Sequence, residues 1–152
     1  EIIFDKRFKE SQFILMGEFK TENKLPENVH NLGFIKDEEL KRIAFCAADL
    51  TLHPAPIDNL PNTVIESIAC QTPVLGFFTG GLTDMVIPDR TGWLVKQIST
   101  DALSLRLDEI LKLNSFESKE LTFSSFKNEI FNPNNIFRQY LEHYYSLVEE
   151  NR

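Results

Sequence analysis

The chain has 152 residues, of which 42% are hydrophobic and 13 are Phe, so we expect one domain with a full apolar core over residues 1–152. Its 23 acidic and 16 basic residues give a formal charge of −7, which argues against nucleic acid or an anionic membrane as the main partner. No basic segment followed by an apolar stretch opens the chain, so membrane contact is expected to be peripheral at most.

The cysteines are Cys46 and Cys70, and each lies beside alanines in a predicted helix. We therefore predict buried, reduced thiols rather than a disulfide. Reduced thiols indicate a cytoplasmic protein, which at most touches the inner face of the membrane.

A buried-type strand that ends in Gly is predicted at residues 13–17, and a second strand with more alternating residues is predicted at residues 29–34. Asp37 is predicted to cap the next helix, since acidic residues follow it in the first turn. The apolar face expected for that helix consists of Leu40, Ile43, Ala44 and Ala47.

The third strand is expected at residues 49–53, and prolines end it and begin an acidic loop at residues 54–62. Asn62 is a predicted N-cap for the helix that follows, because its side-chain oxygen can accept a hydrogen bond from a free amide. Glu66 interrupts the apolar positions of this helix near its amino end, so it is not core filling. Residues 73–77 are a continuous apolar run typical of a parallel strand buried on both faces.

The rest of the chain is predicted to hold one more strand and several helices. Turns rich in Gly, Pro and Asp flank a short helix at residues 82–87, and the fifth strand covers residues 93–95. A helix begins at Asp101, a Ser-, Glu- and Phe-rich stretch follows at residues 115–130, and Pro133 opens a last helix.

Strands that alternate with helices predict an α/β fold with a Rossmann-like, doubly wound and mostly parallel sheet, followed by carboxyl-terminal helices. Such sheets bind ligands beyond the carboxyl ends of their strands. Asp58 and Glu66 both belong to segments that follow the third strand, so we expect them at this edge.

Six short motifs occur in order over roughly residues 10–96. They are Asn31-Leu32-Gly33-Phe34, Ala47-Ala48-Asp49, Asp58 with Glu66, Ala69-Cys70-Gln71-Thr72-Pro73-Val74, Gly80-Gly81 and Thr91-Gly92-Trp93-Leu94-Val95. Together they resemble the carboxyl-terminal, donor-binding half of GT-B-fold retaining glycosyltransferases of the group 1 (family 4) type. The resemblance implies an enzyme half that binds a UDP- or GDP-linked sugar and belongs to a hexosyltransferase of polysaccharide biosynthesis.

The resemblance also implies roles for individual residues. Glu66 would accept hydrogen bonds from the ribose hydroxyls, and Asp58 would contact hydroxyls of the transferred sugar. These two are the candidate catalytic residues. The donor-binding set comprises Glu66, the amides of Asn62 and Thr63 for the diphosphate, Ile35 and Lys36 beside the base, and Gly80 and Gly81, where backbone would approach the sugar and acceptor side.

The sequence departs from the family pattern at several places. Asp58 stands where the family usually has Glu, and Gln71 stands where it usually has Gly. Lys6 and Arg7 do not lie in the motif of the cationic pair that neutralises the diphosphate, so that role is not transferred to them. The amino end looks like the tail of a helix. We therefore expect that the first strand and the amino-terminal domain, which would bind a saccharide or lipid-linked acceptor, lie outside this chain, and that this chain alone does not turn over.

Two other functions remain open at this point. One is a nucleotide-sugar epimerase of the same architecture, and the other is a non-catalytic protein-interaction module. We expect no metal site and no cofactor besides the donor, because no His or Cys lies at ligand spacing from His53. We expect His53 to be a packed or solvent-facing residue at a strand end rather than a functional one. We expect Tyr140, Tyr144 and Tyr145 to serve in helix packing.

Overall fold

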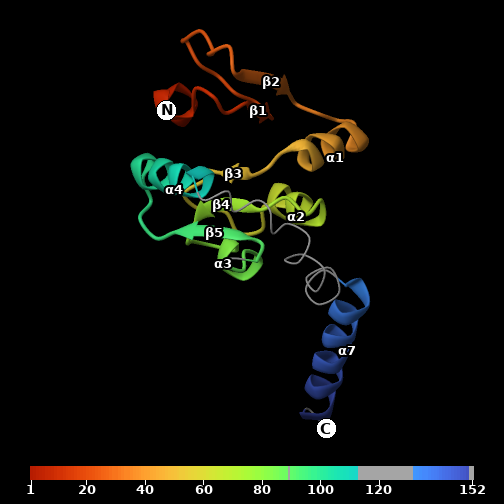
Figure 1. Ribbon diagram of the computed structural model, residues 1–152. Helices are drawn as coiled ribbons and strands as arrows, with labels where there is room; N and C mark the ends of the chain where they lie inside the picture. The colour runs from red at the N-terminus through yellow and green to blue at the C-terminus, as the bar shows by residue number, and fades with distance from the viewer. Residues whose placement is uncertain (89, 113–131, 151–152) are drawn as a thin grey trace.

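The computed structural model describes residues 1–88, 90–112 and 132–150, and the Ser-, Glu- and Phe-rich stretch lies outside these ranges. The strands in them run parallel to their neighbours, as predicted (Figure 1). They form two sheets rather than one continuous sheet, since β1 pairs only with β2 and β3 only with β4 within the described residues. The strands are β1 (Phe13–Met16), β2 (Val29–Gly33), β3 (Thr51–His53), β4 (Val74–Phe77) and β5 (Gly92–Val95).

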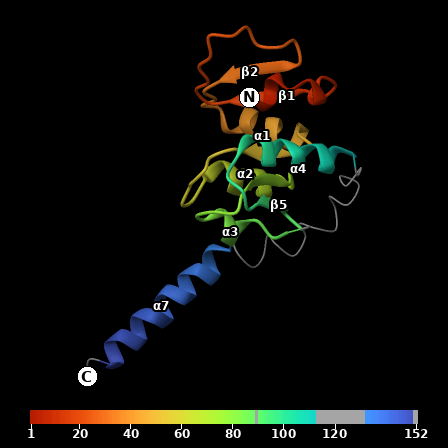
Figure 2. The same cartoon turned by 90° about the vertical axis from the view of Figure 1, so that its left-hand side faces the viewer.

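Helices alternate with the strands, which confirms the Rossmann-like α/β fold. At the amino end the chain forms two 3-10 turns instead of the end of an α-helix. The last helix extends away from the rest of the molecule (Figure 2). The helical elements are η1 (Ile2–Phe4), η2 (Lys6–Phe8), α1 (Glu38–Ala47), α2 (Asn62–Ala69), α3 (Leu82–Met85), α4 (Thr100–Lys112) and α7 (Pro133–Glu150).

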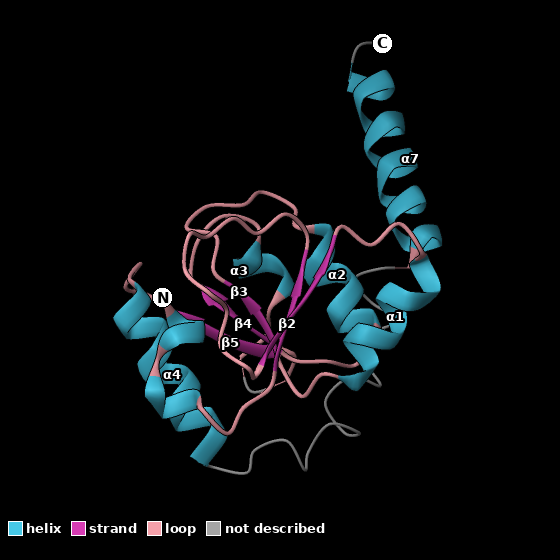
Figure 3. Ribbon diagram, turned by 90° about the horizontal axis from the view of Figure 1, so that it is seen from above, coloured by secondary structure: helices cyan, strands magenta, loops and turns pink. Residues whose placement is uncertain are grey.

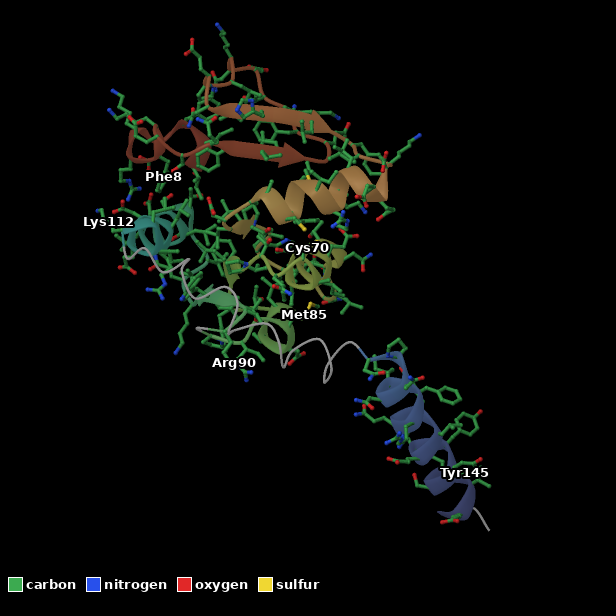
Figure 4. The ribbon with its side chains drawn as sticks, turned by 45° about the vertical axis from the view of Figure 1, so that its right-hand side comes forward. Phe8, Cys70, Met85, Arg90, Lys112 and Tyr145 are labelled. Carbon is green, nitrogen blue, oxygen red and sulfur yellow. The ribbon has the colours of Figure 1, made fainter. Side chains whose placement is uncertain are left out.

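The β4 strand is the centre of the core, and all four of its residues are buried. Because side chains alternate along a strand, Leu75 and Phe77 pack with the inner face of α4, whereas Val74 packs with α2 and α3. Figure 3 shows the strands between α4 on one side and α2 on the other. Phe8 joins the α4 cluster from the amino-terminal segment (Figure 4). The prediction of a strand buried on both faces is thus confirmed.

The α1 helix begins as predicted, because the Asp37 side chain accepts hydrogen bonds from the amides of Glu39 and Leu40 at 2.9 and 3.2 Å. Its predicted apolar face is largely wrong. Leu40 and Ile43 are 47% and 51% exposed, and Phe45 is the large side chain that is buried. The helix contacts α2 through the side that carries Phe45, which rotates the expected face outward.

The α2 helix begins one residue earlier than the sequence suggested. Pro61 is the N-cap, without a side-chain hydrogen bond, and Asn62 is the first helical residue. The Pro61 carbonyl oxygen accepts the Val64 amide at 3.0 Å. The predicted role of Asn62 as the cap is therefore wrong, because the proline ring already holds φ at −68°, a value suited to a helix entry.

The turn from α2 to β4 contains Gln71 in the left-handed region, with φ of 62°. Hydrogen bonds brace this turn. The Ser67 hydroxyl donates to the Thr72 carbonyl oxygen at 2.8 Å, and the Thr72 hydroxyl donates to the Phe45 carbonyl oxygen at 2.6 Å. Neighbouring contacts thus hold a conformation that glycine would adopt at lower cost.

Two cysteines that were expected to be buried are partly or fully exposed. Cys46 is exposed and Cys70 is half-buried, so the prediction that both are buried is wrong. Both are free thiols, in agreement with the prediction that they form no disulfide. Tyr140 and Tyr144 on α7 are more than 70% exposed and do not pack on the described body of the molecule. No helix within the described ranges has both the length and the apolar character needed to cross a membrane.

Candidate functional site

The carboxyl ends of the parallel strands carry all of the predicted site residues. In each sheet these ends share one edge, as parallel pairing requires. Ile35 and Lys36 follow β2 in one sheet. In the other sheet, Asp58 lies between β3 and α2, while Gly80 and Gly81 lie between β4 and α3. The fold therefore places the candidate residues on corresponding loops, but on two sheets.

The loop after β4 packs directly on the acidic loop. The Gly81 amide donates to the Asp58 carbonyl oxygen at 2.9 Å. A Cβ on Gly80 would overlap that same oxygen, and a Cβ on Gly81 would overlap the Asn59 carbonyl oxygen. The glycine pair is needed here because backbone from the two loops meets with no room for a side chain. Access of a sugar to these glycines stays a prediction.

His53 is a packed residue, one of the two possibilities that the sequence analysis gave for it, and it lies beside Asp58. It is the last residue of β3, and its Nε2 lies 3.5 Å from Asp58 Oδ2, too long for a hydrogen bond. This nitrogen is buried without a hydrogen-bond partner in the described part of the chain. Burial lowers the pKa of His53 below 6.5, and the charge of Asp58 opposes that shift only partly. A neutral imidazole beside the Asp58 carboxylate follows at pH 7.

Glu66 lies in the second turn of α2 and is half-buried. Its Oε1 accepts a hydrogen bond from Lys41 Nζ of α1 at 3.1 Å. Lys41 also binds both carboxylate oxygens of Glu38, at 3.0 and 3.1 Å. These hydrogen bonds, first to Glu38 and then to Glu66, raise the pKa of Lys41. One oxygen of the Glu66 carboxylate is therefore held by the ammonium group of Lys41.

Lys41 is a residue that sequence reasoning did not assign to the site. In the sequence it is simply a charged position on an amphipathic helix with an acidic residue three positions earlier. Its link to Glu66 spans 25 positions along the chain and becomes visible only when α1 packs on α2. A groove of about 400 Å³ lies between these helices, and its lining includes Lys41, Phe45, Glu66 and Cys70. Figure 4 shows Cys70 in this region.

The amino end of α2 leaves donors available. Pro61 has no amide hydrogen, and within the described ranges no acceptor is recorded for the Asn62 and Thr63 amides. Both residues are exposed. Two amides that carry helix-terminus partial charge suit an anion such as a diphosphate. The loop after β2 offers the exposed Lys36 side chain and a half-buried Ile35.

Comparison with known proteins gives a consistent set of relatives. Residues 12–122 match the family described as Glycosyl transferases group 1. The N-acetyl-alpha-D-glucosaminyl L-malate synthase of Bacillus anthracis is 24% identical over 155 residues, which cover 94% of this chain and 39% of that protein.

Solved structures share the fold. HepE from Anabaena in complex with UDP has a TM-score of 0.73 and 18% identity, and the match covers 95% of this chain and 44% of that one. The same protein with UDP-glucose has a TM-score of 0.70 and 19% identity, with the same coverage. Sucrose-phosphate synthase from Thermosynechococcus elongatus has a TM-score of 0.65 and 24% identity over 95% of this chain and 41% of that one. The chain thus spans about two fifths of the length of these relatives.

Proposed function

This chain belongs to the glycosyl transferase group 1 family, and we propose that it forms the half of a retaining hexosyltransferase that binds the nucleotide-diphosphate sugar. The observation that carries the proposal is the position of Asp58, the free α2 amides and Glu66, which follow one another directly after the carboxyl end of β3. Support also comes from HepE, whose structures contain UDP and UDP-glucose.

In this proposal each group of the donor has a chemically matched partner. The Glu66 carboxylate accepts hydrogen bonds from the vicinal ribose hydroxyls, and the Asn62 and Thr63 amides bind the diphosphate. Asp58 accepts hydrogen bonds from hydroxyls of the sugar, whereas Ile35 and Lys36 border the base. Gly80 and Gly81 hold the acidic loop in place, which sets the position of Asp58.

The reaction proposed is transfer with retention at the anomeric carbon. The acceptor hydroxyl oxygen forms a bond to the anomeric carbon while the bond between that carbon and the diphosphate oxygen breaks. The proton of the acceptor hydroxyl passes to the diphosphate leaving group. Stabilisation of the developing diphosphate charge by the helix-terminal amides is the main electrostatic contribution of this half. Donor and acceptor binding need no further cofactor in this scheme.

The domain assignment is part of the same proposal. Residues 1–152 act as one of two halves, and the saccharide or lipid-linked acceptor binds to the other half, together with a further strand supplied from outside this chain. The two-fifths coverage of the relatives supports this division. We expect this chain alone to bind donor without turnover, in the cytoplasm and in the context of polysaccharide assembly. The family match favours a transferase over the epimerase or the interaction module.

Donor binding can be tested by nuclear magnetic resonance titration with UDP, GDP and their glucose or mannose conjugates. Amide signals of Ile35, Asn62 and Glu66 should shift with one nucleotide series and saturate. Glu109→Ala is a suitable control, because Glu109 lies on α4, pairs with Arg106 and does not line the groove beside Glu66. If millimolar nucleotide of either base leaves all three signals in place, donor binding by this chain is wrong.

A further inference from the structure

We propose that Lys41 is a positioning residue for the donor: it holds one oxygen of the Glu66 carboxylate so that the other oxygen points to the nucleotide ribose. This inference rests on the proposed function and adds a residue on a different helix to it. In this role Lys41 orients the Glu66 carboxylate and does not contact the diphosphate itself.

The hydrogen-bond geometry is the first argument. Lys41 Nζ lies 3.1 Å from Glu66 Oε1, and no partner is recorded for Glu66 Oε2 in the described part of the chain. An ammonium group has three donors, and here they are shared between Glu66 and the two oxygens of Glu38. Glu38 thus anchors Lys41 from the solvent side, and half of the Glu66 carboxylate stays available for a ligand hydroxyl.

Burial separates this ion pair from an ordinary surface pair. The Lys41 and Glu66 side chains are 22% and 33% exposed, whereas Arg42 and Glu39 in the next ion pair of the same helix are 58% and 63% exposed. Exposed pairs add little because water screens them and both side chains lose rotamer freedom. The Lys41–Glu66 pair is shielded enough to restrict the rotamers of Glu66.

Position in the fold is the third argument. The α1 helix begins directly after the loop that carries Ile35 and Lys36, and Lys41 lies one turn into it. The ion pair therefore ties the helix behind the proposed base loop to the carboxylate proposed for the ribose. Because Glu66 is already ordered before the nucleotide arrives, binding pays less side-chain entropy.

The test compares two nucleotides that differ only in the ribose hydroxyls. Affinities for UDP and for 2′,3′-dideoxy-UDP are measured by calorimetry on the wild-type protein and on Lys41→Met, Lys41→Arg and the matched control Arg42→Met. We expect Lys41→Met to weaken the affinity for UDP about 3- to 10-fold, which is the range for the net contribution of one lost hydrogen bond. It should leave the dideoxy nucleotide unchanged. Lys41→Arg should restore most of the UDP affinity, and Arg42→Met should leave it at the wild-type value.

The contrary outcomes are distinct. An equal loss for both nucleotides would show that Lys41 acts through its charge on the diphosphate, and an unchanged or tighter UDP affinity in Lys41→Met would show that it does not orient Glu66. Either result overturns the positioning role alone if Glu66→Ala still weakens UDP. Failure of the wild-type protein to bind UDP or GDP overturns the proposed function as well. Thermal unfolding of each variant shows whether it is folded.

Discussion

The amide of Gly81 donates a 2.9 Å hydrogen bond to the carbonyl oxygen of Asp58, which ties the loop after β4 to the acidic loop after β3. The contact joins backbone atoms of the two loops, so it fixes the position of the Asp58 backbone without using the Asp58 side chain. The carboxylate remains available for His53 or for a ligand. The backbone of Asp58 thus determines its position, whereas its side chain is left for chemical interactions.

Gly81→Ala should disrupt this contact. The new Cβ would overlap the Asn59 carbonyl oxygen, and backbone cannot move aside as a flexible side chain does. We expect the free energy of unfolding to fall by about 1–3 kcal/mol, as for overpacking of a filled site. Urea denaturation measures this loss, with Asp84→Ala on the adjacent α3 as the control. A stability equal to that of the control would contradict the close approach.

Glu66→Ala should weaken nucleotide binding by about 1–3 kcal/mol, because the acceptor proposed for the ribose hydroxyls is lost. The loss should disappear when 2′,3′-dideoxy-UDP is the ligand. Calorimetry gives both affinities, and Glu109→Ala on α4 serves as a charge-matched control outside the groove that Glu66 lines. Equal affinities of wild type and Glu66→Ala for UDP would remove Glu66 from the site.

Asp58→Ala should discriminate between a nucleotide and its sugar conjugate. If Asp58 contacts the sugar, the variant loses about 0.5–1.5 kcal/mol in binding the conjugate and almost nothing in binding the free diphosphate. Titrations with UDP and UDP-glucose, or with the GDP pair if that base binds, measure the difference. A parallel loss for both ligands would place Asp58 near the nucleotide instead.

His53 should make the protein less stable in mild acid. Burial lowers the folded-state pKa of His53 below its unfolded value of 6.5, so the unfolded chain binds more protons in between. The contribution of neutral His53 is complete above pH 6.5 and is lost as the pH falls toward the folded pKa. The difference between the urea midpoints at pH 7.5 and pH 5.5 should therefore be smaller in His53→Gln than in the wild-type protein. The exposed His143, changed to Gln, should leave the wild-type difference intact.

Gln71→Gly should stabilise the protein by about 0.5–1 kcal/mol. Gln71 has a φ of 62°, where a Cβ is unfavourable and glycine is not. The gain is partly offset by the larger entropy of glycine in the unfolded chain. Gln71→Ala keeps the Cβ and should bring no gain, so the two variants together isolate the backbone effect in a denaturation experiment.

The strands and their parallel direction were predictable because their signals are local and strong. Residues 73–77 form an apolar run that fits only a strand covered on both faces, and β4 is buried throughout. The Asp37 cap was equally local. The face of α1 was not, since Leu40 and Ile43 have the spacing of a buried stripe but Phe45 is the residue that meets α2. Tertiary packing turned the side with Phe45 toward α2, although charged residues such as Lys41 lie on that side too.

The site followed the same division. Asp58 and Glu66 could be placed at the ligand edge because the alternation of strand and helix determines which loops lie there. Lys41 and His53 could not be assigned, because their partners are chosen by helix packing and by the depth of a strand end. The cysteines show the same limit: flanking alanines suggested burial, yet Cys46 faces outward.

The separation of the strands into two sheets has a mechanical consequence for the site. Ile35 and Lys36 extend from the β1-β2 sheet, whereas Asp58 and Glu66 extend from the β3-β4-β5 sheet. Within the described residues, no ladder of backbone hydrogen bonds joins these two sheets. The residues proposed for the base and those proposed for the ribose are therefore linked by the connecting chain through α1 and by side-chain contacts, one of which is the Lys41–Glu66 pair. A strand inserted between β1 and β3 would act as a spacer that sets the width of the proposed nucleotide site.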